Sequence, residues 1–272
     1  MRVICWFSGG VTSAIACKIS IDLYGLHNCR FIFIDTKNED ADTYRFLEDC
    51  ENWYGAKIER MSNNKYNNID EVWEKFGGMN FAHGAICSAE LKRNVRIKFE
   101  KENEYKYQVF GFDIDEPKRA KSMAMNYPKS KPIFPLLFEG LSKKDCIERL
   151  TEAGIDPPQA YKDGFQNNNC LNTGCVQGGI WYWQKIEKDY PDRFNAMAKR
   201  EHYFTDKKGQ PVTLLRDQSN EAKKQDVRNL FLLPHPNYSE LKDISMFKGV
   251  QPKPLMECNG FCATDDLFSQ IN

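Results

Sequence analysis

The sequence predicts an α/β fold: a doubly wound, mostly parallel sheet of about five or six strands, followed by an irregular C-terminal extension. Strand-length apolar runs alternate with helix-length segments from the first residues onward, as in βαβ units. The run Cys29 to Asp35 is apolar almost throughout, which is typical of a strand covered on both faces. A glycine-containing turn joins the first strand directly to the first helix.

The first half of the chain contains four expected strands and four expected helices. We expect strands at 2–7, 29–35, 56–61 and 107–112, and helices at 14–24, 42–53, 69–76 and 88–102. Gly55 and Gly77 follow two of these helices, and glycine is favoured there because it adopts the left-handed conformation that ends a helix.

The second half is less regular. We expect an extended segment at 132–137, helices at 143–153, 180–188 and 192–202, and a hairpin at 202–215 around 207–210. Four prolines in the polar stretch 216–254 exclude long regular elements there. The division expected from this pattern is a core at 1–140, a helical, cysteine-containing part at 141–202 and an extension with a cysteine pair at 203–272.

Composition limits the classes of function. The chain has 272 residues, 41% of them hydrophobic, and a formal net charge of zero, so a dominant electrostatic attraction to nucleic acid or to an anionic membrane is not indicated. No apolar run has the length of a membrane span, and the first residues lack the pattern of a signal peptide. We expect a cytoplasmic protein with no membrane partner.

The first motif is the turn Ser8-Gly9-Gly10-Val11-Thr12-Ser13 between the first strand and the first helix. Backbone N–H groups and a helix N-terminus converge on an anion in such an arrangement, and glycines let a phosphate approach the backbone. The hydroxyl groups of Ser8, Thr12 and Ser13 add donors. Taken alone, the same residues also suit an ordinary tight turn before a serine-capped helix.

The second motif is a set of late cysteines. The chain has ten cysteines, and two close pairs lie in loop-like sequence, Cys170 with Cys175 and Cys258 with Cys262. Two such pairs in a reducing compartment suit a four-thiolate site for Zn²⁺ or a [4Fe–4S] cluster. Reduced thiols or a redox pair are the alternatives.

Three further stretches follow later strands: Asp35 to Tyr44 (DTKNEDADTY), Cys87 to Arg96 (CSAELKRNVR) and Gly111 to Arg119 (GFDIDEPKR). Together with the first turn, they resemble the motifs of the PP-loop ATP pyrophosphatases, the adenine-nucleotide α-hydrolase-like superfamily with a HUP-type fold. The resemblance is closest to phosphoadenylylsulfate (PAPS) reductase-like proteins, a branch that includes phage-encoded members. It spans roughly residues 2 to 201. Thr12 departs from the family pattern, in which Asp is usual at that position.

The resemblance implies roles for individual residues. The phosphates would lie on Ser8, Gly9, Gly10, Thr12 and Ser13. Asp35 and Thr36 would contact the adenine or the ribose, and Gly111 would allow the backbone to approach the nucleotide. Lys92, Arg93 and Arg119 would hold the transferring or leaving group. Asp115 and Glu116 would either bind Mg²⁺ or position Arg119.

The resemblance also implies a reaction. An enzyme of this kind binds ATP or a related adenylate such as PAPS, cleaves the α,β-phosphoanhydride and so activates an acceptor, with a nucleic acid or a sulfur carrier as candidates. One alternative is thiol-dependent PAPS reduction, with Cys258 as nucleophile and Cys262 as resolving thiol. Another is a nucleotide-binding sensor or assembly subunit without turnover. The sequence leaves the oligomeric state open, with a homodimer as one candidate.

Overall fold

The computed structural model describes residues 2–81 and 84–251, and these form two compact units. Within the described residues, the first unit contains 2–65 and 88–169, and the second contains 66–81, 84–87 and 170–251. No helix in the described part of the chain is both long enough and apolar enough to cross a membrane.

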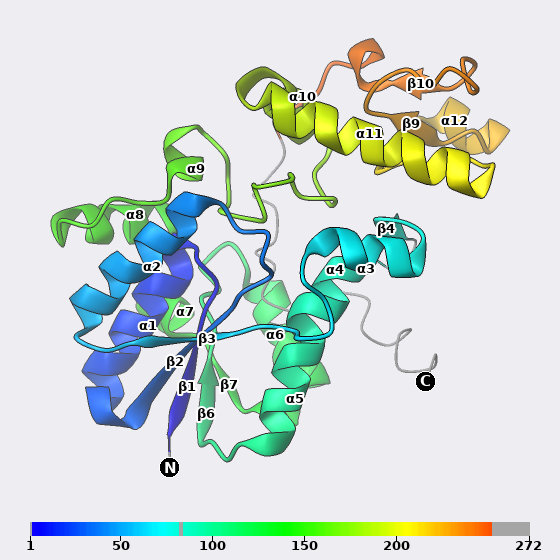
Figure 1. Ribbon diagram of the computed structural model, residues 1–272. Helices are drawn as coiled ribbons and strands as arrows, with labels where there is room; N and C mark the ends of the chain where they lie inside the picture. Colours follow the sequence, from blue (N-terminus) through cyan, green and yellow to red (C-terminus); the bar gives the residue numbers. More distant parts are fainter. Residues whose placement is uncertain (1, 82–83, 252–272) are drawn as a thin grey trace. The chain divides into compact units, whose positions relative to one another are not determined.

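The first unit is built on a five-stranded sheet in the order β3-β2-β1-β6-β7, shown in Figure 1. All four strand pairs are parallel. The strands are β1 (Val3–Phe7), β2 (Cys29–Ile34), β3 (Ile58–Met61), β6 (Tyr107–Val109) and β7 (Pro132–Ile133). This confirms the predicted α/β class and the parallel sheet.

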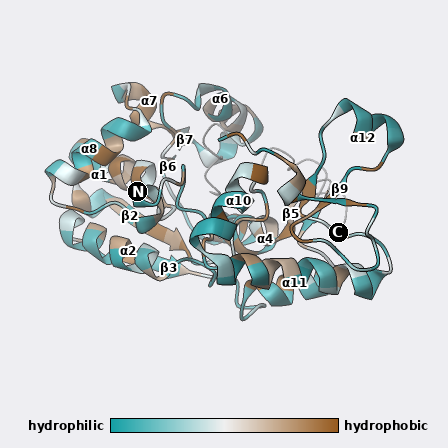
Figure 2. Cartoon of the chain, turned by 90° about the horizontal axis from the view of Figure 1, so that it is seen from above, coloured by the Kyte–Doolittle hydropathy of each residue, from teal (hydrophilic) through white to brown (hydrophobic). Residues whose placement is uncertain are grey.

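Alternation along the strands divides the core into two layers. Val3, Cys5 and Phe7 of β1 join the hydrophobic cluster on one face of the sheet, whereas Ile4 and Trp6 join the cluster on the other. Successive side chains of a strand point to opposite faces, so a strand with both faces covered must be apolar throughout. Figure 2 shows hydrophobic residues gathered on these strands.

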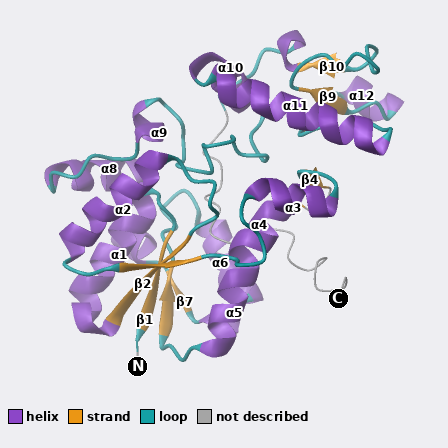
Figure 3. Cartoon of the chain, in the orientation of Figure 1, coloured by secondary structure: helices purple, strands orange, loops and turns teal. Residues whose placement is uncertain are grey.

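Helices cover both faces of the sheet (Figure 3). One cluster includes residues of α1, α2, α7 and α8, and the other includes residues of α5 and α6. The helices with residues in this unit are α1 (Val11–Tyr24), η1 (Leu26–Asn28), α2 (Ala41–Tyr54), α4 (Ile86–Ser88), the π-helical η2 (Ala89–Arg93), α5 (Asn94–Glu102), α6 (Pro117–Asn126), η3 (Pro128–Ser130), α7 (Pro135–Glu139), α8 (Lys143–Glu152) and α9 (Gln159–Lys162).

The strand order changes direction beside β1. The chain passes outward through β2 and β3 and then returns to β6 on the opposite side of β1, so the direction of strand addition reverses between β1 and β6. In open α/β sheets, ligands bind beyond the carboxyl ends of the strands at such a reversal. The segments that follow β1, β2 and β6 meet at this edge, and they carry three of the four sequence motifs.

The second unit combines helices with short strands. Its elements are α3 (Ile69–Phe76), β4 (Asn80–Phe81), β5 (Gly84–Ala85), α10 (Ile180–Asp189), α11 (Pro191–Lys208), β8 (Leu215–Arg216), α12 (Asn220–Gln225), β9 (Asn229–Phe231), β10 (Lys242–Asp243) and η4 (Ile244–Met246). β10, β9 and β8 form a three-stranded sheet. The fully buried Glu201 of α11 joins this sheet to the helix, because its carboxylate accepts the N–H groups of Leu214 (2.8 Å) and Leu232 (2.7 Å).

Three sequence-based expectations were wrong. Only Pro132 and Ile133 of the extended segment expected at 132–137 form a strand, and the helix α7 begins at Pro135. The hairpin expected at 202–215 does not form, because α11 continues through Lys208 and ends at Gly209, which has the left-handed conformation. Phe194, Ala198, Glu201 and Thr205 are buried at helical spacing along α11, so packing extends the helix past residue 202. The first helix begins at Val11 rather than at Ala14, which places Thr12 and Ser13 in its first turn.

Candidate functional site

The turn after β1 is held by the hydroxyl group of Ser13. Ser13 Oγ accepts hydrogen bonds from the backbone N–H and the Oγ of Ser8, each at 3.0 Å, and donates to the carbonyl oxygen of Gly10 at 2.8 Å. Gly10 is extended, with φ −99° and ψ 161°, and begins α1 without a side-chain cap. The first turn of α1 contains no acidic residue, so the positive end of the helix dipole is not neutralised from within its own first turn.

Thr12 is the least expected member of this turn. Its side chain is 1% exposed, and its Oγ1 makes no hydrogen bond to any residue in the described part of the chain. A buried hydroxyl without a partner costs free energy. The first turn of α1 therefore carries one unused donor beside Gly10, at the edge of the sheet where ligands bind in this class of fold.

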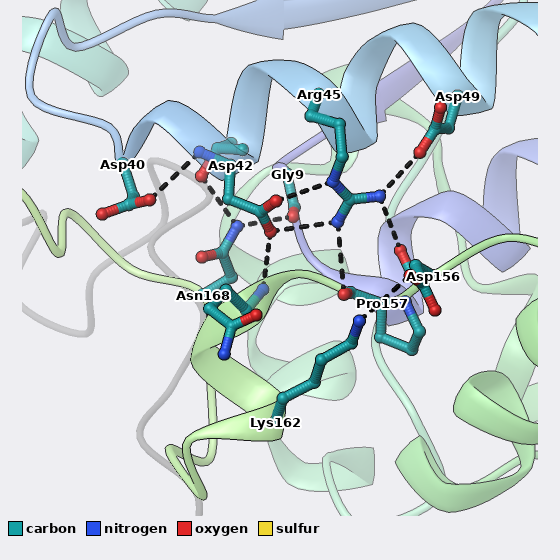
Figure 4. Close-up of polar contacts among 11 residues, drawn as sticks. Gly9, Asp40, Asp42, Arg45, Asp49, Asp156, Pro157, Lys162 and Asn168 are labelled. Atoms are coloured by element: carbon teal, nitrogen blue, oxygen red, sulfur yellow. Dashed lines mark hydrogen bonds and ion pairs between the residues drawn. The ribbon is translucent and has the colours of Figure 1, made fainter.

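Gly9 is held between two segments that lie far apart in the sequence. It has a φ of 85°, and a Cβ at this position would lie 2.8 Å from Thr43 Cγ2. The amide Nδ2 of the buried Asn168 donates to Gly9 O and to Thr43 Oγ1, both at 2.9 Å. Figure 4 shows Asn168 beside Gly9. One asparagine thus connects the turn after β1 to the start of α2.

A second network fixes the chain that leads to Asn168. Arg45 of α2 binds Asp42 and Asp49 at 2.6 Å each and donates to the carbonyl oxygens of Asp156 and Pro157, as Figure 4 shows. The hydrogen bond from Arg45 is the main cause that lowers the pKa of Asp42, although burial opposes it. These contacts hold the backbone at 156–157 against α2.

The segment after β2 contains a buried ion pair. The Thr36 hydroxyl donates to Glu39 Oε1 at 2.8 Å, and Lys92 Nζ lies 3.6 Å from the same oxygen. Both charged side chains are buried. Asp35 accepts hydrogen bonds from the N–H of Lys37 and the hydroxyl of Tyr44. The second and third sequence motifs therefore meet at the carboxyl end of β2.

Gly111 follows β6 and lies directly against the start of α1. A Cβ on Gly111 would lie 2.6 Å from the backbone nitrogen of Ser13 and 2.8 Å from the carbonyl carbon of Thr12. Real Cβ atoms do not approach backbone so closely, so only glycine fits without movement. In the structure, the close approach that glycine permits is to the first turn of α1.

Charged residues follow Gly111. Arg119 Nη1 binds Glu116 Oε1 at 2.7 Å, and the guanidinium lies 4.5 Å from the centre of the Phe112 ring. Asp115 is exposed, and its N–H donates to the carboxylate of Asp113. Arg119 is therefore held beside Glu116, and the two roles expected for Glu116 stay predictions. Arg93, in η2, is half-buried.

The predicted cysteine site is only partly described. Cys170 and Cys175 belong to the second unit and are half-buried. Burial raises the pKa of the nearby Tyr182, and the two thiols add to that rise. The N–H of Cys175 donates to the Tyr182 hydroxyl at 2.9 Å. Cys258 and Cys262 lie outside the described residues. Within 2–81 and 84–251, no group of three or more His, Cys, Asp or Glu side chains is placed to hold a metal ion.

Three residues of this site escaped the sequence analysis. Asn168 was one of three successive asparagines in a loop, and nothing in that run indicates which of them contacts Gly9. Glu39 lies in the second motif, but nothing in the sequence indicates that it contacts Lys92 of the third. Tyr161, whose hydroxyl accepts the N–H of Val11 at 3.4 Å, gave no signal, because the contact joins residues 150 positions apart.

Residues 2–173 match the family described as the phosphoadenosine phosphosulfate reductase domain. Among solved structures, the chain is similar to a PAPS reductase from Candida auris in a phosphate complex, with 16% identity over 61% of this chain and 79% of that chain and a TM-score of 0.46. It is also similar to the U34-tRNA thiolase NcsA from Methanococcus maripaludis with its [4Fe-4S] cluster, with 12% identity over 74% of this chain and 70% of that chain and a TM-score of 0.37. No curated protein matches. The chain belongs to the phosphoadenosine phosphosulfate reductase domain family.

Proposed function

We propose that the first unit binds ATP or a related adenylate at the carboxyl edge of its sheet and cleaves the α,β-phosphoanhydride to activate an acceptor. The observation that carries this proposal is the buried, unpartnered hydroxyl of Thr12 in the first turn of α1. This hydroxyl belongs to the first turn of α1, which follows the N-cap residue Gly10 and contains no acidic residue. An anion at this position would accept the hydroxyl and gain from the helix dipole.

The nucleotide would lie across the segments that follow three strands. Ser8, Gly9, Gly10, Thr12 and Ser13 would hold the phosphates, and Asp35 and Thr36 would contact the adenine or the ribose. Lys92, Arg93 and Arg119 would stabilise the charge that develops on the transferring and leaving groups. The contacts of Lys92 with Glu39 and of Arg119 with Glu116 support this role, since they fix the directions of two cations.

The proposed reaction is an in-line displacement at the α-phosphorus. A nucleophilic atom of the acceptor forms a bond to that phosphorus, and the bond to the bridging oxygen breaks. Pyrophosphate leaves with the bonding electron pair, and the acceptor becomes adenylated. A nucleic acid or a sulfur carrier is the proposed acceptor class.

Mg²⁺ would accompany the phosphates. This ion commonly takes only one or two carboxylates from a protein and its remaining ligands from phosphate and water. Asp115 fits that limited donor set because it is exposed within the motif 111–119. Glu116 uses its Oε1 for Arg119, so its other oxygen would be the second candidate ligand. Mg²⁺ would neutralise part of the negative charge of the phosphates.

A further proposal concerns the two close cysteine pairs. Cys170 and Cys175 would provide two thiolates to Zn²⁺ or a [4Fe–4S] cluster, and Cys258 and Cys262 the other two. Thiolates suit both groups. The half-buried positions of Cys170 and Cys175 around Tyr182 support a site that is partly shielded from water.

The family match favours a second candidate reaction. Phosphoadenosine phosphosulfate reductase domains suggest PAPS as substrate, with the Cys258 thiolate attacking the sulfur atom. The sulfonate would be transferred to that thiol, adenosine 3′,5′-bisphosphate would leave, and Cys262 would then form a disulfide and release sulfite. Incubation with ATP or with PAPS separates the candidates: pyrophosphate supports the first and sulfite the second. Nucleotide binding with neither product supports a sensor or assembly subunit.

A further inference from the structure

The second unit contains a cavity that the proposed reaction does not use. Its volume is about 430 Å³, and residues of β4, the start of α10 and β8 line it. The lining side chains that matter here are those of Asn80, Phe81, Ile180, Arg216 and Gln218, together with the backbone of Gly179. All of these residues belong to one compact unit. Ligand cavities commonly fall in this range of volumes.

The charge of the cavity favours an anion. Arg216 is the cation among the lining residues, and no carboxylate is among them. Arg216 has no ion pair or hydrogen bond through its side chain to another residue within 2–81 and 84–251. The neighbouring carboxylate of Asp217 is already bound by Lys242 at 3.0 Å and by the N–H of Ser219 at 2.8 Å. The guanidinium is therefore available to a ligand.

The start of α10 forms another wall of the same cavity. Gly179 is its N-cap residue, and no side chain accepts the first N–H groups through that cap. The first turn contains no acidic residue. These donors add to the positive potential of Arg216. Two amide side chains also line the cavity. Gln218 accepts from Arg228 through its side-chain oxygen, which leaves its amide nitrogen as a donor. Asn80 donates its amide nitrogen to two carbonyl oxygens, which leaves its side-chain oxygen as an acceptor.

The remaining wall is apolar. Phe81 and Ile180 are both partly exposed beside buried Leu214 and Leu215. A partly exposed aromatic ring in a cavity offers a surface for a flat apolar group. The cavity thus joins one cation and several hydrogen-bonding groups to an aromatic wall.

We propose that this cavity binds a phosphate or sulfate ester of an aromatic body, with the anionic ester at Arg216 and the N-terminus of α10 and the ring against Phe81 and Ile180. This site is separate in sequence from the phosphate-binding turn, and the inference does not depend on the proposed reaction.

The full-length chain can be tested by isothermal titration calorimetry with four probes: phenyl phosphate, phenyl sulfate, phenol and inorganic phosphate. If the cavity binds as proposed, at least one ester should bind more tightly than phenol and more tightly than inorganic phosphate. The tighter of the two esters identifies the anion. Equal affinity for the ester and for either fragment would overturn the assignment, as would no binding of either ester.

Two variants remove the anion site by different means. Arg216→Gln removes the cation, and its control Lys224→Gln removes an exposed positive charge from α12. Gly179→Asp adds a carboxylate to the wall and a side chain that can cap the first N–H groups of α10, whereas its control Gly179→Ala adds only a methyl group that cannot cap them. The backbone at Gly179 has φ −82°, and no atom lies within 4 Å of a Cβ placed there, so the fold should tolerate both changes.

We expect ester affinity to fall by about tenfold or more in both variants, because Arg216→Gln removes the favourable charge and Gly179→Asp adds a carboxylate that repels the ester and caps the N–H donors. The controls Lys224→Gln and Gly179→Ala, and Gly111→Ala in the other unit, should keep the affinity of the unmodified protein. Equal affinity in Gly179→Asp and Gly179→Ala would show that the ester does not lie at this cavity.

Discussion

Gly111 lies against the backbone of Ser13 so closely that the first atom of any side chain would meet it at 2.6 Å. The segment after β6 therefore packs on the first turn of α1, and the position of one fixes the position of the other. Because Ser13 also holds Ser8 and Gly10, the whole turn after β1 depends on this contact. The family motif that contains Gly111 is in this way coupled to the motif that contains Thr12.

Gly111→Ala should disturb the turn. The three closest atoms are backbone atoms of Thr12 and Ser13, which cannot rotate away, so the backbone must shift. We expect the free energy of unfolding to fall by about 1–3 kcal/mol and adenine-nucleotide affinity to fall at least tenfold. Urea denaturation and calorimetric titration with ATP measure the two effects. Gly179→Ala is the control, because Gly179 lies in open space at φ −82°. An equal loss of stability and nucleotide affinity in Gly179→Ala would show that close packing at Gly111 is not the cause.

Thr12→Val separates stability from binding. Valine keeps the shape of threonine and removes a buried hydroxyl that has no partner among the described residues. We expect the free energy of unfolding to stay level or to rise by up to about 1 kcal/mol, while ATP affinity falls. Both changes are measured on the same preparation by urea denaturation and titration.

Ser13→Ala is the matched contrast for Thr12→Val. It removes a hydroxyl that makes hydrogen bonds to Ser8 and Gly10, so stability should fall by about 1–3 kcal/mol. If Thr12→Val instead lost stability and kept its nucleotide affinity, the Thr12 hydroxyl would have a structural partner and the phosphate assignment would be wrong.

Glu201 predicts a pH dependence of stability. Burial raises the pKa of its carboxyl group from 4.5 to about 8, against the opposing effect of the two backbone hydrogen bonds. The folded state then binds the proton more tightly than the unfolded state does, so this contribution is complete below about pH 4.5 and is lost as the pH rises to about 8. Urea midpoints measured across this window should fall with pH.

Glu201→Gln should remove that slope and lower stability at acidic pH, where the Glu201 carboxyl group is neutral, because the amide nitrogen would face one of two backbone donors, Leu214 or Leu232. Glu187→Gln, at an exposed position of α10, should keep the slope. A slope that persists in Glu201→Gln would assign the titration to another group.

The cysteine proposal predicts metal in the purified protein. Protein prepared without oxygen should contain zinc, or iron with acid-labile sulfide, and the double variant Cys170→Ser with Cys175→Ser should lose it. Cys17→Ser serves as control, because Cys17 is buried in the core of the other unit. A preparation with neither metal, or an unchanged metal content in the double variant, would contradict the four-thiolate site.

Much of the fold could be predicted because its signals are local. β1, α3 and α8 lie within a residue or so of their expected bounds, since apolar runs, glycine ends and the Ser142 capping box act over a few residues. The hairpin expected at 202–215 failed because burial of Phe204 and Thr205 extends α11, and such burial depends on distant partners. The small sheet of β8, β9 and β10 was missed for the same reason.

The site was predictable in its motifs and not in its connections. The turn, the segment after β2 and the segment after β6 were located from sequence. Their links, from Asn168 to Gly9, from Lys92 to Glu39 and from Gly111 to Ser13, join residues that no local pattern relates. The three-part division of the chain and the roles of individual site residues stay predictions.

Pyrophosphate release tests the proposed cleavage of the α,β-phosphoanhydride of ATP. The full-length protein is incubated with ATP and Mg²⁺, with and without a nucleic-acid or sulfur-carrier acceptor, and pyrophosphate is measured against Gly111→Ala and Gly179→Ala. We expect pyrophosphate from the unmodified protein and from Gly179→Ala, and at least tenfold less from Gly111→Ala. Equal release by all three proteins, or none from the unmodified protein with any of these acceptors, would contradict the proposed cleavage.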